Sequence, residues 1–209
     1  MRKPPANRPR DRRLDDAELS LLETAFKSCR NPVVKHVFFF ALATGMRRGE
    51  VLSLEWRYID LDSSTAYLPV TKNGEARRVP LSPLARQILL QRKEAPVRPS
   101  NGFPGTIDRP DGGQFTNEPT GSNEGFQDKV FPITANAFKL AWSRVRQRAG
   151  VVDLRLHDMR HEAISRFFEM GLSIPEVALI SGHKDPRMLF RYTHLRAEDL
   201  AKKILSMTS

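Results

Sequence analysis

The 209-residue sequence predicts a mainly helical α+β fold with one small three-stranded antiparallel sheet. Three observations lead to this prediction. Apolar residues recur at helical spacing through most of the chain, signals typical of strands are confined to residues 59–81, and no unit of roughly 20–50 residues repeats. A chain of this length buries about 70% of the surface that its unfolded form exposes, so it can form a substantial core.

The N-terminal helices carry start and stop signals. Asp15 and Glu18 have the spacing of a capping box and predict that a helix begins there. A second helix is predicted from Pro32 to Gly45, with the glycine as its C-terminal cap. This segment is apolar on most sides, which predicts a central, buried position. A short amphipathic turn follows at residues 50–54.

The sheet is predicted from three β-prone runs and one hairpin signal. Asn73-Gly74 predicts a type I′ turn between the second and third runs. Pro69 and Pro80 cannot donate main-chain hydrogen bonds and therefore predict edge positions for both of those runs. The three runs are Ile59–Asp62, Ala66–Thr71 and Ala76–Leu81.

Further helices are predicted on either side of a long polar stretch. One spans Pro83 to about Lys93, and residues 96–128 are then rich in Gly, Pro, Asn and Ser, which predicts a long loop or a surface insertion. Five helices are predicted in the C-terminal part. The first is capped by Thr134 or Asn136 and closed by Gly150, and the second runs from near His157 to Met170. The third is opened by the capping box of Ser173 and Glu176, the fourth by Asp185-Pro186, and the last spans Ala197–Leu205.

The chain is strongly basic. Lysine and arginine number 34 against 24 acidic residues, which gives a net charge of +10 and an isoelectric point near 10.2. Such a balance favours an anionic partner, most often nucleic acid. Half of the charge lies in the proline-rich residues 1–13, which hold six basic residues and one acid. This segment is interpreted as a solvated tail or an interdomain linker, with a DNA-binding arm as the alternative.

Several classes of protein are excluded by composition. The longest apolar run, Val37–Ala43, has 7 residues, far fewer than the roughly 20 that a membrane-spanning helix needs. The N-terminus has no apolar segment typical of a signal peptide. The single cysteine, Cys29, excludes an internal disulfide or a cysteine-based zinc site. We therefore expect a soluble chain in a reducing, intracellular compartment.

A candidate site begins at His157-Asp158-Met159-Arg160. His157 and Arg160 are three residues apart, so they share one face of a helix. Apolar residues continue that face, so Arg160 should be largely buried and should need an anionic partner. That partner is either a carboxylate of the core, Glu50 or Asp158, or a bound anion.

Three further segments supply side chains that suit one chemistry. Arg47 follows a predicted buried helix and its glycine cap, His183 lies between two predicted helices, and Tyr192 comes nine residues after His183. Arginines can neutralise the non-bridging oxygens of a phosphodiester, and histidines can hydrogen-bond the phosphate or move protons. A phenol oxygen can attack phosphorus. The combination points to phosphoryl transfer.

Together these segments resemble the catalytic domain of the tyrosine recombinase, or phage integrase, family. Each segment alone is weak, but the full set in this order and spacing is specific, and the resemblance runs from about Leu14 to near the C-terminus. It implies a mixed, mainly helical fold, which agrees with the fold predicted from periodicity. The matching segments are Thr44-Gly45-Met46-Arg47 with Glu50, Thr71-Lys72-Asn73-Gly74, His157-Asp158-Met159-Arg160-His161, Ser181-Gly182-His183 and Arg191-Tyr192.

The resemblance implies a role for each matching residue. Tyr192 would be the nucleophile, and the two arginines would bind the scissile phosphate. Lys72 would protonate the leaving 5′-oxygen, unless it is simply a solvent-exposed lysine of a turn. The two histidines would contact the phosphate and assist the nucleophile, and Glu50 would orient the arginines. The implied catalytic residues are Arg47, Lys72, His157, Arg160, His183 and Tyr192.

The implied function is that of a site-specific DNA recombinase or integrase. Such an enzyme cuts and rejoins double-stranded DNA through a 3′-phosphotyrosine intermediate, here on Tyr192, and uses neither a cofactor nor a metal. We expect residues 14–209 to form the catalytic domain of a cytoplasmic, DNA-associated protein of a bacterium or phage. We also expect a monomer in free solution and a homotetramer on paired DNA sites, with the segment 197–205 exchanged between neighbouring subunits in that assembly.

Parts of the same sequence are compatible with different functions. His157 and His161 are four residues apart and could belong to a metal-binding helix, although a third ligand is not evident. The chain could also be a non-catalytic DNA-binding module or a type IB-like DNA-relaxing enzyme. Family members usually carry a separate N-terminal helical domain, whereas only 13 residues precede the catalytic domain here. We therefore expect a fragment or a truncated product with reduced DNA affinity.

Overall fold

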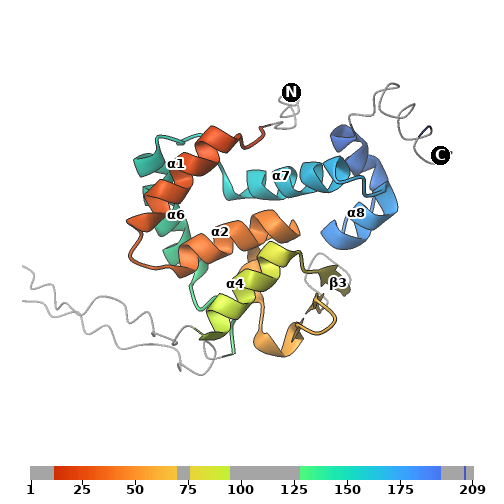
Figure 1. Cartoon of the computed structure of the whole chain (residues 1–209), viewed down its shortest axis with the longest axis horizontal. Helices are drawn as coiled ribbons and strands as arrows, with labels where there is room; N and C mark the ends of the chain where they lie inside the picture. The colour runs from red at the N-terminus through yellow and green to blue at the C-terminus, as the bar shows by residue number, and fades with distance from the viewer. Residues whose placement is uncertain (1–11, 70–75, 95–127, 194–204, 206–209) are drawn as a thin grey trace, which may run out of the picture.

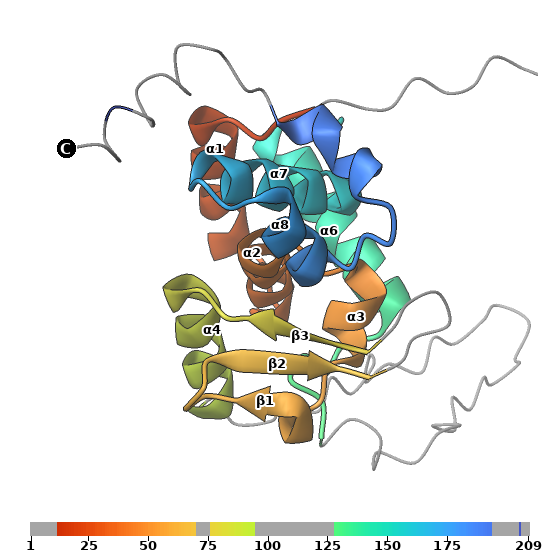
Figure 2. The ribbon, with the colours of Figure 1, turned by 90° about the vertical axis from the view of Figure 1, so that its right-hand side faces the viewer.

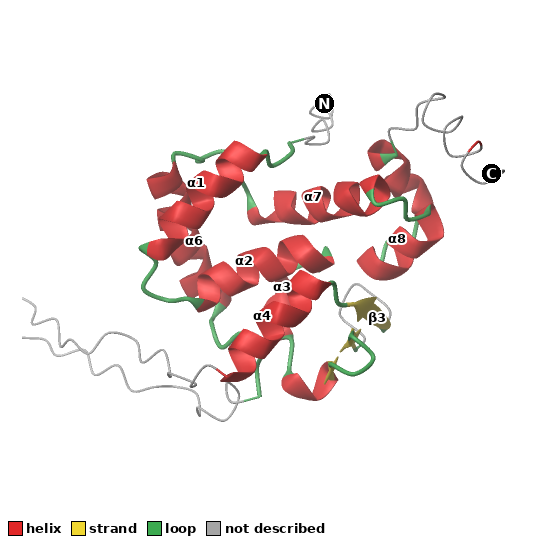
Figure 3. Ribbon diagram, in the orientation of Figure 1, coloured by secondary structure: helices red, strands yellow, loops and turns green. Residues whose placement is uncertain are grey.

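The computed structural model describes residues 12–69, 76–94, 128–193 and 205. Its helices surround one central helix, α2 (Val33–Thr44), and its strands are gathered at one side of the molecule (Figure 1, Figure 3). This arrangement confirms the predicted mainly helical fold with a small antiparallel sheet.

The core is built on α2. Helices α1 (Asp16–Lys27) and α6 (Ala135–Ala149) pack against each other, and α4 (Pro83–Glu94) and α7 (Leu156–Glu169) pack on α2. Phe38 of α2 stacks on Trp142 of α6 with ring centroids 5.1 Å apart. Phe38 is fully buried, and burial of a side chain of that size contributes about 1.5–3 kcal/mol. The apolar character of α2 thus explains its central position.

The predicted helix caps are present. The carboxylate of Asp15 accepts a hydrogen bond from the main-chain nitrogen of Glu18 at 2.7 Å. Thr134, one of two predicted candidates, caps α6 by accepting from the main-chain nitrogen of Ala137 at 3.1 Å. Each bond satisfies a main-chain donor that the first turn of a helix leaves unpaired.

The sheet contains β1 (Ile59–Asp60), β2 (Thr65–Leu68) and β3 (Arg77–Pro80) in that order, with both pairs antiparallel. The prediction that two runs are edge strands was wrong for β2, which is central. Pro69 falls just outside β2, so it removes no hydrogen bond from the ladder, whereas Pro80 lies in the edge strand β3. β3 lies beside α8 (Ile174–Ser181), as Figure 2 shows.

Short elements complete the fold. α3 (Arg48–Ser53) and the 3₁₀ helix η1 (Trp56–Tyr58) connect α2 to the sheet, and the 3₁₀ helix η2 (Pro186–Tyr192) follows α8. The main-chain nitrogen of Val130 donates to the carbonyl of Leu54 at 2.9 Å, which ties the chain before α6 to the end of α3. Among the described residues, every helix is too short or too polar to cross a lipid bilayer.

The last two residues of the predicted tail contact the folded domain. Arg13 forms an ion pair with Glu162 at 2.7 Å, and the main-chain nitrogen of Leu14 donates to the same carboxylate at 3.1 Å. Arg12 pairs with Glu18. Most of four predicted segments lies outside the described residues: the rest of the tail, the Asn73-Gly74 turn, residues 96–127 of the long stretch and residues 197–204 of the last predicted helix.

Candidate active site

Arg47 is placed by the turn between α2 and α3. Gly45 ends α2 in the left-handed conformation (φ 63°), where a Cβ would lie 3.3 Å from the ring of Phe167. Arg47 is then the N-cap residue of α3, and Glu50 accepts from its main-chain nitrogen at 2.8 Å and from its guanidinium at 2.9 Å. The first bond fixes the main chain at the start of α3, and the second holds the Arg47 side chain, which is 40% exposed.

Glu50 is buried, and a second arginine also binds it. Arg77 of β3 donates through Nη1 and Nη2 to the two carboxylate oxygens at 3.0 and 2.8 Å. Burial opposes ionisation of Glu50, but hydrogen bonds from Arg77 and Arg47 outweigh it and lower the pKa of the carboxyl. One carboxylate charge therefore stands against two guanidinium charges.

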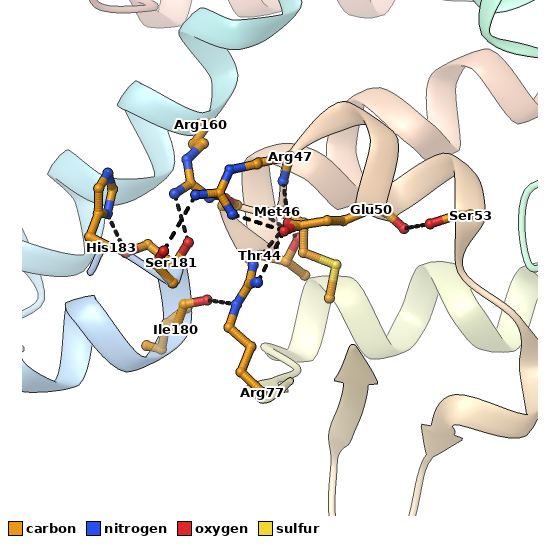
Figure 4. A network of polar contacts seen from close by, with 12 residues as sticks. Thr44, Met46, Arg47, Glu50, Ser53, Arg77, Arg160, Ile180, Ser181 and His183 are labelled. Carbon is orange, nitrogen blue, oxygen red and sulfur yellow. Dashed lines mark hydrogen bonds and ion pairs between the residues drawn. The ribbon is translucent and has the colours of Figure 1, made fainter. Parts of the chain in front are cut away.

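Arg160 is 4% exposed, which confirms the predicted burial. Among the described residues Arg160 hydrogen-bonds neither Glu50 nor Asp158, so the carboxylate alternative is not realised and the bound anion stays a prediction. Nη1 and Nη2 of Arg160 donate at 2.6 Å each to main-chain carbonyls, of Gly45 and of Ser181 (Figure 4). Burial, followed by the nearby charge of Arg47, lowers the pKa of Arg160 to about 10, so the group stays protonated at neutral pH. Carbonyls satisfy its hydrogen bonds but carry no net charge, so a positive charge is left to attract an anion.

A cleft of about 410 Å³ brings these groups together. Arg47, Arg160 and His157 line it, with the exposed Arg48 and Arg155 alongside. Burial, followed by the charge of Arg160, lowers the pKa of His157. A cleft lined by several arginines suits a phosphodiester, whose non-bridging oxygens accept charge-assisted hydrogen bonds.

His183 is fixed at the end of α8. Its Nδ1 lies 2.6 Å from the hydroxyl of Ser181, and that hydroxyl lies 2.6 Å from the carbonyl of Val177. The hydroxyl of Ser181 has one hydrogen, and it donates that hydrogen to the carbonyl of Val177. In its contact with His183 the hydroxyl must therefore accept, so Nδ1 of His183 carries the hydrogen. Burial and the charges of Arg160 and Arg47 lower the pKa of His183 to about 4, so Nε2 is an acceptor at neutral pH.

Tyr192 ends η2 and packs against His161, which lies one turn after His157 on α7. The rings of His157 and His161 meet edge to face with centroids 4.7 Å apart, and the ring of His161 stacks on Tyr192 at 5.7 Å. The phenol oxygen of Tyr192 hydrogen-bonds Nδ1 of His161. The Tyr192 ring is 8% exposed and packs with Ile164 and the other apolar residues of a small separate cluster.

His161 is suited to accept the phenol proton. Burial, followed by the charges of His157 and Arg191, lowers the pKa of His161 to about 4. The imidazole is therefore neutral at pH 7, and its Nδ1 can accept a hydrogen bond. A phenol with an ordinary pKa near 10 needs such an acceptor to become a nucleophile at neutral pH.

The family model described as "Phage integrase family" matches residues 12–199. The chain belongs to the phage integrase family. It is 42% identical over 205 residues to the shufflon-specific DNA recombinase of Escherichia coli, covering 98% of this chain and 45% of that protein. The chain spans about half the length of the curated relatives it matches.

Solved structures of integrases show the same fold. The catalytic domain of bacteriophage HP1 integrase has a TM-score of 0.60 at 20% identity, covering 92% of both chains. The Tn1549 transposon integrase in complex with circular intermediate DNA has a TM-score of 0.67 at 18% identity, covering 97% of this chain and 69% of that one.

Among the residues that the sequence predicts for this phage integrase family site, five are brought into one region. Arg47, His157 and Arg160 line the cleft. His183 follows α8 and contacts Ser181, whose carbonyl binds Arg160, and Tyr192 of η2 contacts His161, which packs on His157. The sixth, Lys72, lies outside the described residues. Within the part of the chain that the structure describes, no three His, Cys, Asp or Glu side chains gather as a metal site requires.

Two further residues contact this predicted site but receive no catalytic role from the sequence, Arg77 and His161. Arg77 shares the inward face of β3 with the buried Val79, since strand residues two apart point the same way, so alternation could have identified it. His161 follows His157 by four residues, so it lies on the same helix face. Its contact with Tyr192 depends on how η2 folds back onto α7, and spacing does not predict that contact.

Proposed function

We propose that this chain is the catalytic portion of a site-specific DNA recombinase that cuts and rejoins DNA through a 3′-phosphotyrosine on Tyr192. The observation that carries the proposal is Arg160, a buried cation whose hydrogen bonds go to carbonyls, beside Arg47 in a cleft. Such a charge is costly unless an anion shares the site. The family membership and the contact of Tyr192 with His161 of the same helix as Arg160 support a DNA phosphodiester as that anion.

The proposed chemistry is an in-line displacement at phosphorus. A bond forms between the phenol oxygen of Tyr192 and phosphorus while the bond from phosphorus to the 5′-oxygen breaks. Arg47 and Arg160 stabilise the negative charge of the pentacoordinate transition state, in the manner of preorganised hydrogen-bond donors. Rejoining is the reverse reaction, with a 5′-hydroxyl as the nucleophile.

Two protons must move for this step to balance. The phenol proton passes to a neutral imidazole, and the contact of Tyr192 with Nδ1 of His161 supports that residue as the acceptor. The leaving 5′-oxygen takes a proton from Lys72, as the family resemblance implies. His157 and His183 contact the phosphate, whose negative charge raises the pKa of a nearby imidazole and favours donation.

DNA binding and assembly are part of the same proposal. Double-stranded DNA is the proposed substrate, and the related shufflon-specific DNA recombinase supports recombination at defined sites. We propose a monomer in free solution and a homotetramer on paired sites. Light scattering after size exclusion should then give about 23.8 kDa without DNA. A stable DNA-free tetramer would contradict this assignment.

Covalent capture from a randomised pool tests the proposal without knowledge of the target sequence. The chain is incubated in EDTA with duplexes of random sequence that carry a nick near the expected cleavage point, so the short released strand diffuses away. We expect protein-linked DNA with the wild type and none with Tyr192→Phe. Arg47→Gln or Arg160→Gln should slow capture by roughly 10²–10³-fold. An adduct that persists in Tyr192→Phe would remove Tyr192 from the role of nucleophile.

A further inference from the structure

Arg77 joins three elements behind the arginine-lined cleft. It comes from β3, and its side chain is 7% exposed. Its Nη1 and Nη2 donate to both oxygens of Glu50 on α3, and its Nε donates to the carbonyl of Ile180 on α8 at 3.1 Å (Figure 4). A bidentate contact fixes the plane of a carboxylate, whereas a single hydrogen bond leaves it free to rotate.

Arg77 and Arg47 share Glu50 but face different surroundings. Each oxygen of Glu50 accepts one bond from Arg47 and one from Arg77, at distances between 2.8 and 3.0 Å. The Arg47 side chain is 40% exposed and lines the cleft, whereas the Arg77 side chain is 7% exposed and borders a separate cavity beside His183. Arg77 is therefore placed to orient Glu50 rather than to contact DNA, and Glu50 in turn holds Arg47.

Main-chain carbonyls at the C-terminal end of α8 accept hydrogen bonds from Arg47, Arg77 and Arg160. The carbonyl of Ile180 accepts from Arg77, that of Ser181 from Arg160 and that of Gly182 from Arg47, the last at 3.4 Å. The C-terminal end of a helix carries a partial negative charge that favours cations. Three consecutive carbonyls thus set the spacing between the two arginines of the cleft and the arginine behind them.

Close packing leaves Arg77 little freedom. A Cβ at Gly182 would lie 2.9 Å from Cζ of Arg77, which is closer than side chains approach. Arg77 also follows Lys72 by five residues, so it anchors the strand that continues from the segment containing that lysine. The contacts of Arg77 therefore hold both Glu50 and the end of α8 against β3.

We propose that Arg77 is a positioning residue for DNA cleavage, which orients Arg47 through Glu50 and fixes β3 against the end of α8. This inference rests on the proposed function. Arg77 is assigned no contact with the phosphate or with Tyr192. Its effect therefore falls on the rate of the chemical step more than on affinity for DNA.

Arg78 provides a matched control on the same strand. Its side chain lies on the opposite face of β3, with its guanidinium 5.9 Å from the ring centroid of Tyr67 and Nη1 3.5 Å from the hydroxyl of Thr65. Arg77→Gln and Arg78→Gln remove the same charge from adjacent positions. Arg77→Lys keeps the charge of Arg77 but loses its planar fork.

The experiment measures adduct formation on a nicked duplex recovered from the randomised pool, at saturating DNA, together with the Kd for that duplex. We expect Arg77→Gln to lower the maximal rate by about 100-fold, the order expected for a displacement of about 1 Å, with a Kd within about threefold of wild type. Arg77→Lys should recover only part of the rate, and Arg78→Gln should stay within about threefold. All measurements are made at temperatures where circular dichroism shows each variant to be folded.

A second measurement separates positioning from a general loss of stability. If Arg77 acts through Glu50, Arg77→Gln should lower the rate by less than about tenfold in a Glu50→Gln background, although it costs about 100-fold in the wild type. Fully multiplicative losses, or equal losses for Arg77→Gln and Arg78→Gln, would overturn the inference. No adduct with the wild type would instead overturn the proposed function, and the inference with it.

Discussion

His161 connects Tyr192, the proposed nucleophile, to the helix that carries Arg160. Its Nδ1 contacts the phenol of Tyr192, and its ring lies between those of Tyr192 and His157. The pKa of His161, lowered to about 4, keeps it neutral across the physiological range. The residue could hold Tyr192 in place, accept its proton, or do both, and two substitutions separate these roles.

His161→Asn and His161→Ala should have similar effects if proton transfer matters. Asparagine can place an oxygen near the position of Nδ1 and accept the hydrogen bond, but it cannot take up a proton at neutral pH. We expect both variants to lose roughly 10²–10⁴-fold in the rate of adduct formation, the usual contribution of a general base. A near-normal rate for His161→Asn beside a slow His161→Ala would restrict His161 to holding Tyr192.

At the scale of elements, the end of α8 is the point where the site is assembled. Gly182 and Gly150 both end helices in the left-handed conformation, with φ of 68° and 70°. A Cβ at Gly182 would meet the guanidinium of Arg77, whereas a Cβ at Gly150 would have nothing within 4 Å. The two glycines therefore differ in surroundings but not in backbone conformation.

Alanine at each position separates backbone strain from displacement of Arg77. Both Gly182→Ala and Gly150→Ala should lose about 1–2 kcal/mol of unfolding free energy, the cost of the left-handed conformation with a Cβ. Only Gly182→Ala should also slow DNA cleavage, because it forces Arg77 to move. Urea unfolding and adduct formation measure the two effects. Equal cleavage rates for the two variants would show that the contact with Arg77 does not matter.

The sequence predicts local features of these elements well and distant contacts poorly. Caps such as Asp15 and Thr134 act within one turn, so residue type and spacing are enough to predict them. The central position of β2 depends on where the ladder ends relative to Pro69, a matter of one residue. The acceptors of Arg160 are carbonyls from two other elements, and no pattern of side chains encodes a main-chain acceptor.

At the scale of the whole molecule, burial of neutral histidines makes stability depend on pH. Burial, the largest cause in each case, lowers the pKa of His36, His161 and His183 to about 4. Their ordinary pKa is about 6.5, so between these values the unfolded chain binds more protons than the folded one. Stability from these groups is therefore complete above pH 6.5 and is lost as the pH falls toward 4.

Urea unfolding between pH 7 and 4.5 tests this dependence. We expect the unfolding free energy to fall by at least about 2 kcal/mol, after allowance for the partial exposure of the three rings. His36 faces a different cavity from the arginine-lined cleft, so His36→Gln should reduce the slope without affecting DNA cleavage. A stability that stays constant over this range would contradict the burial of these histidines as neutral groups.

Mass spectrometry of the covalent complex is the most direct test of phosphoryl transfer to Tyr192. DNA captured on the wild-type chain is digested with nuclease and trypsin, and the modified peptide is sequenced. We predict a nucleotide joined through its 3′-phosphate to the phenol oxygen of Tyr192, formed in EDTA. A nucleotide on any other residue or a linkage through a 5′-phosphate would contradict phosphoryl transfer to Tyr192. So would the absence of any modified peptide when the chain has bound the DNA.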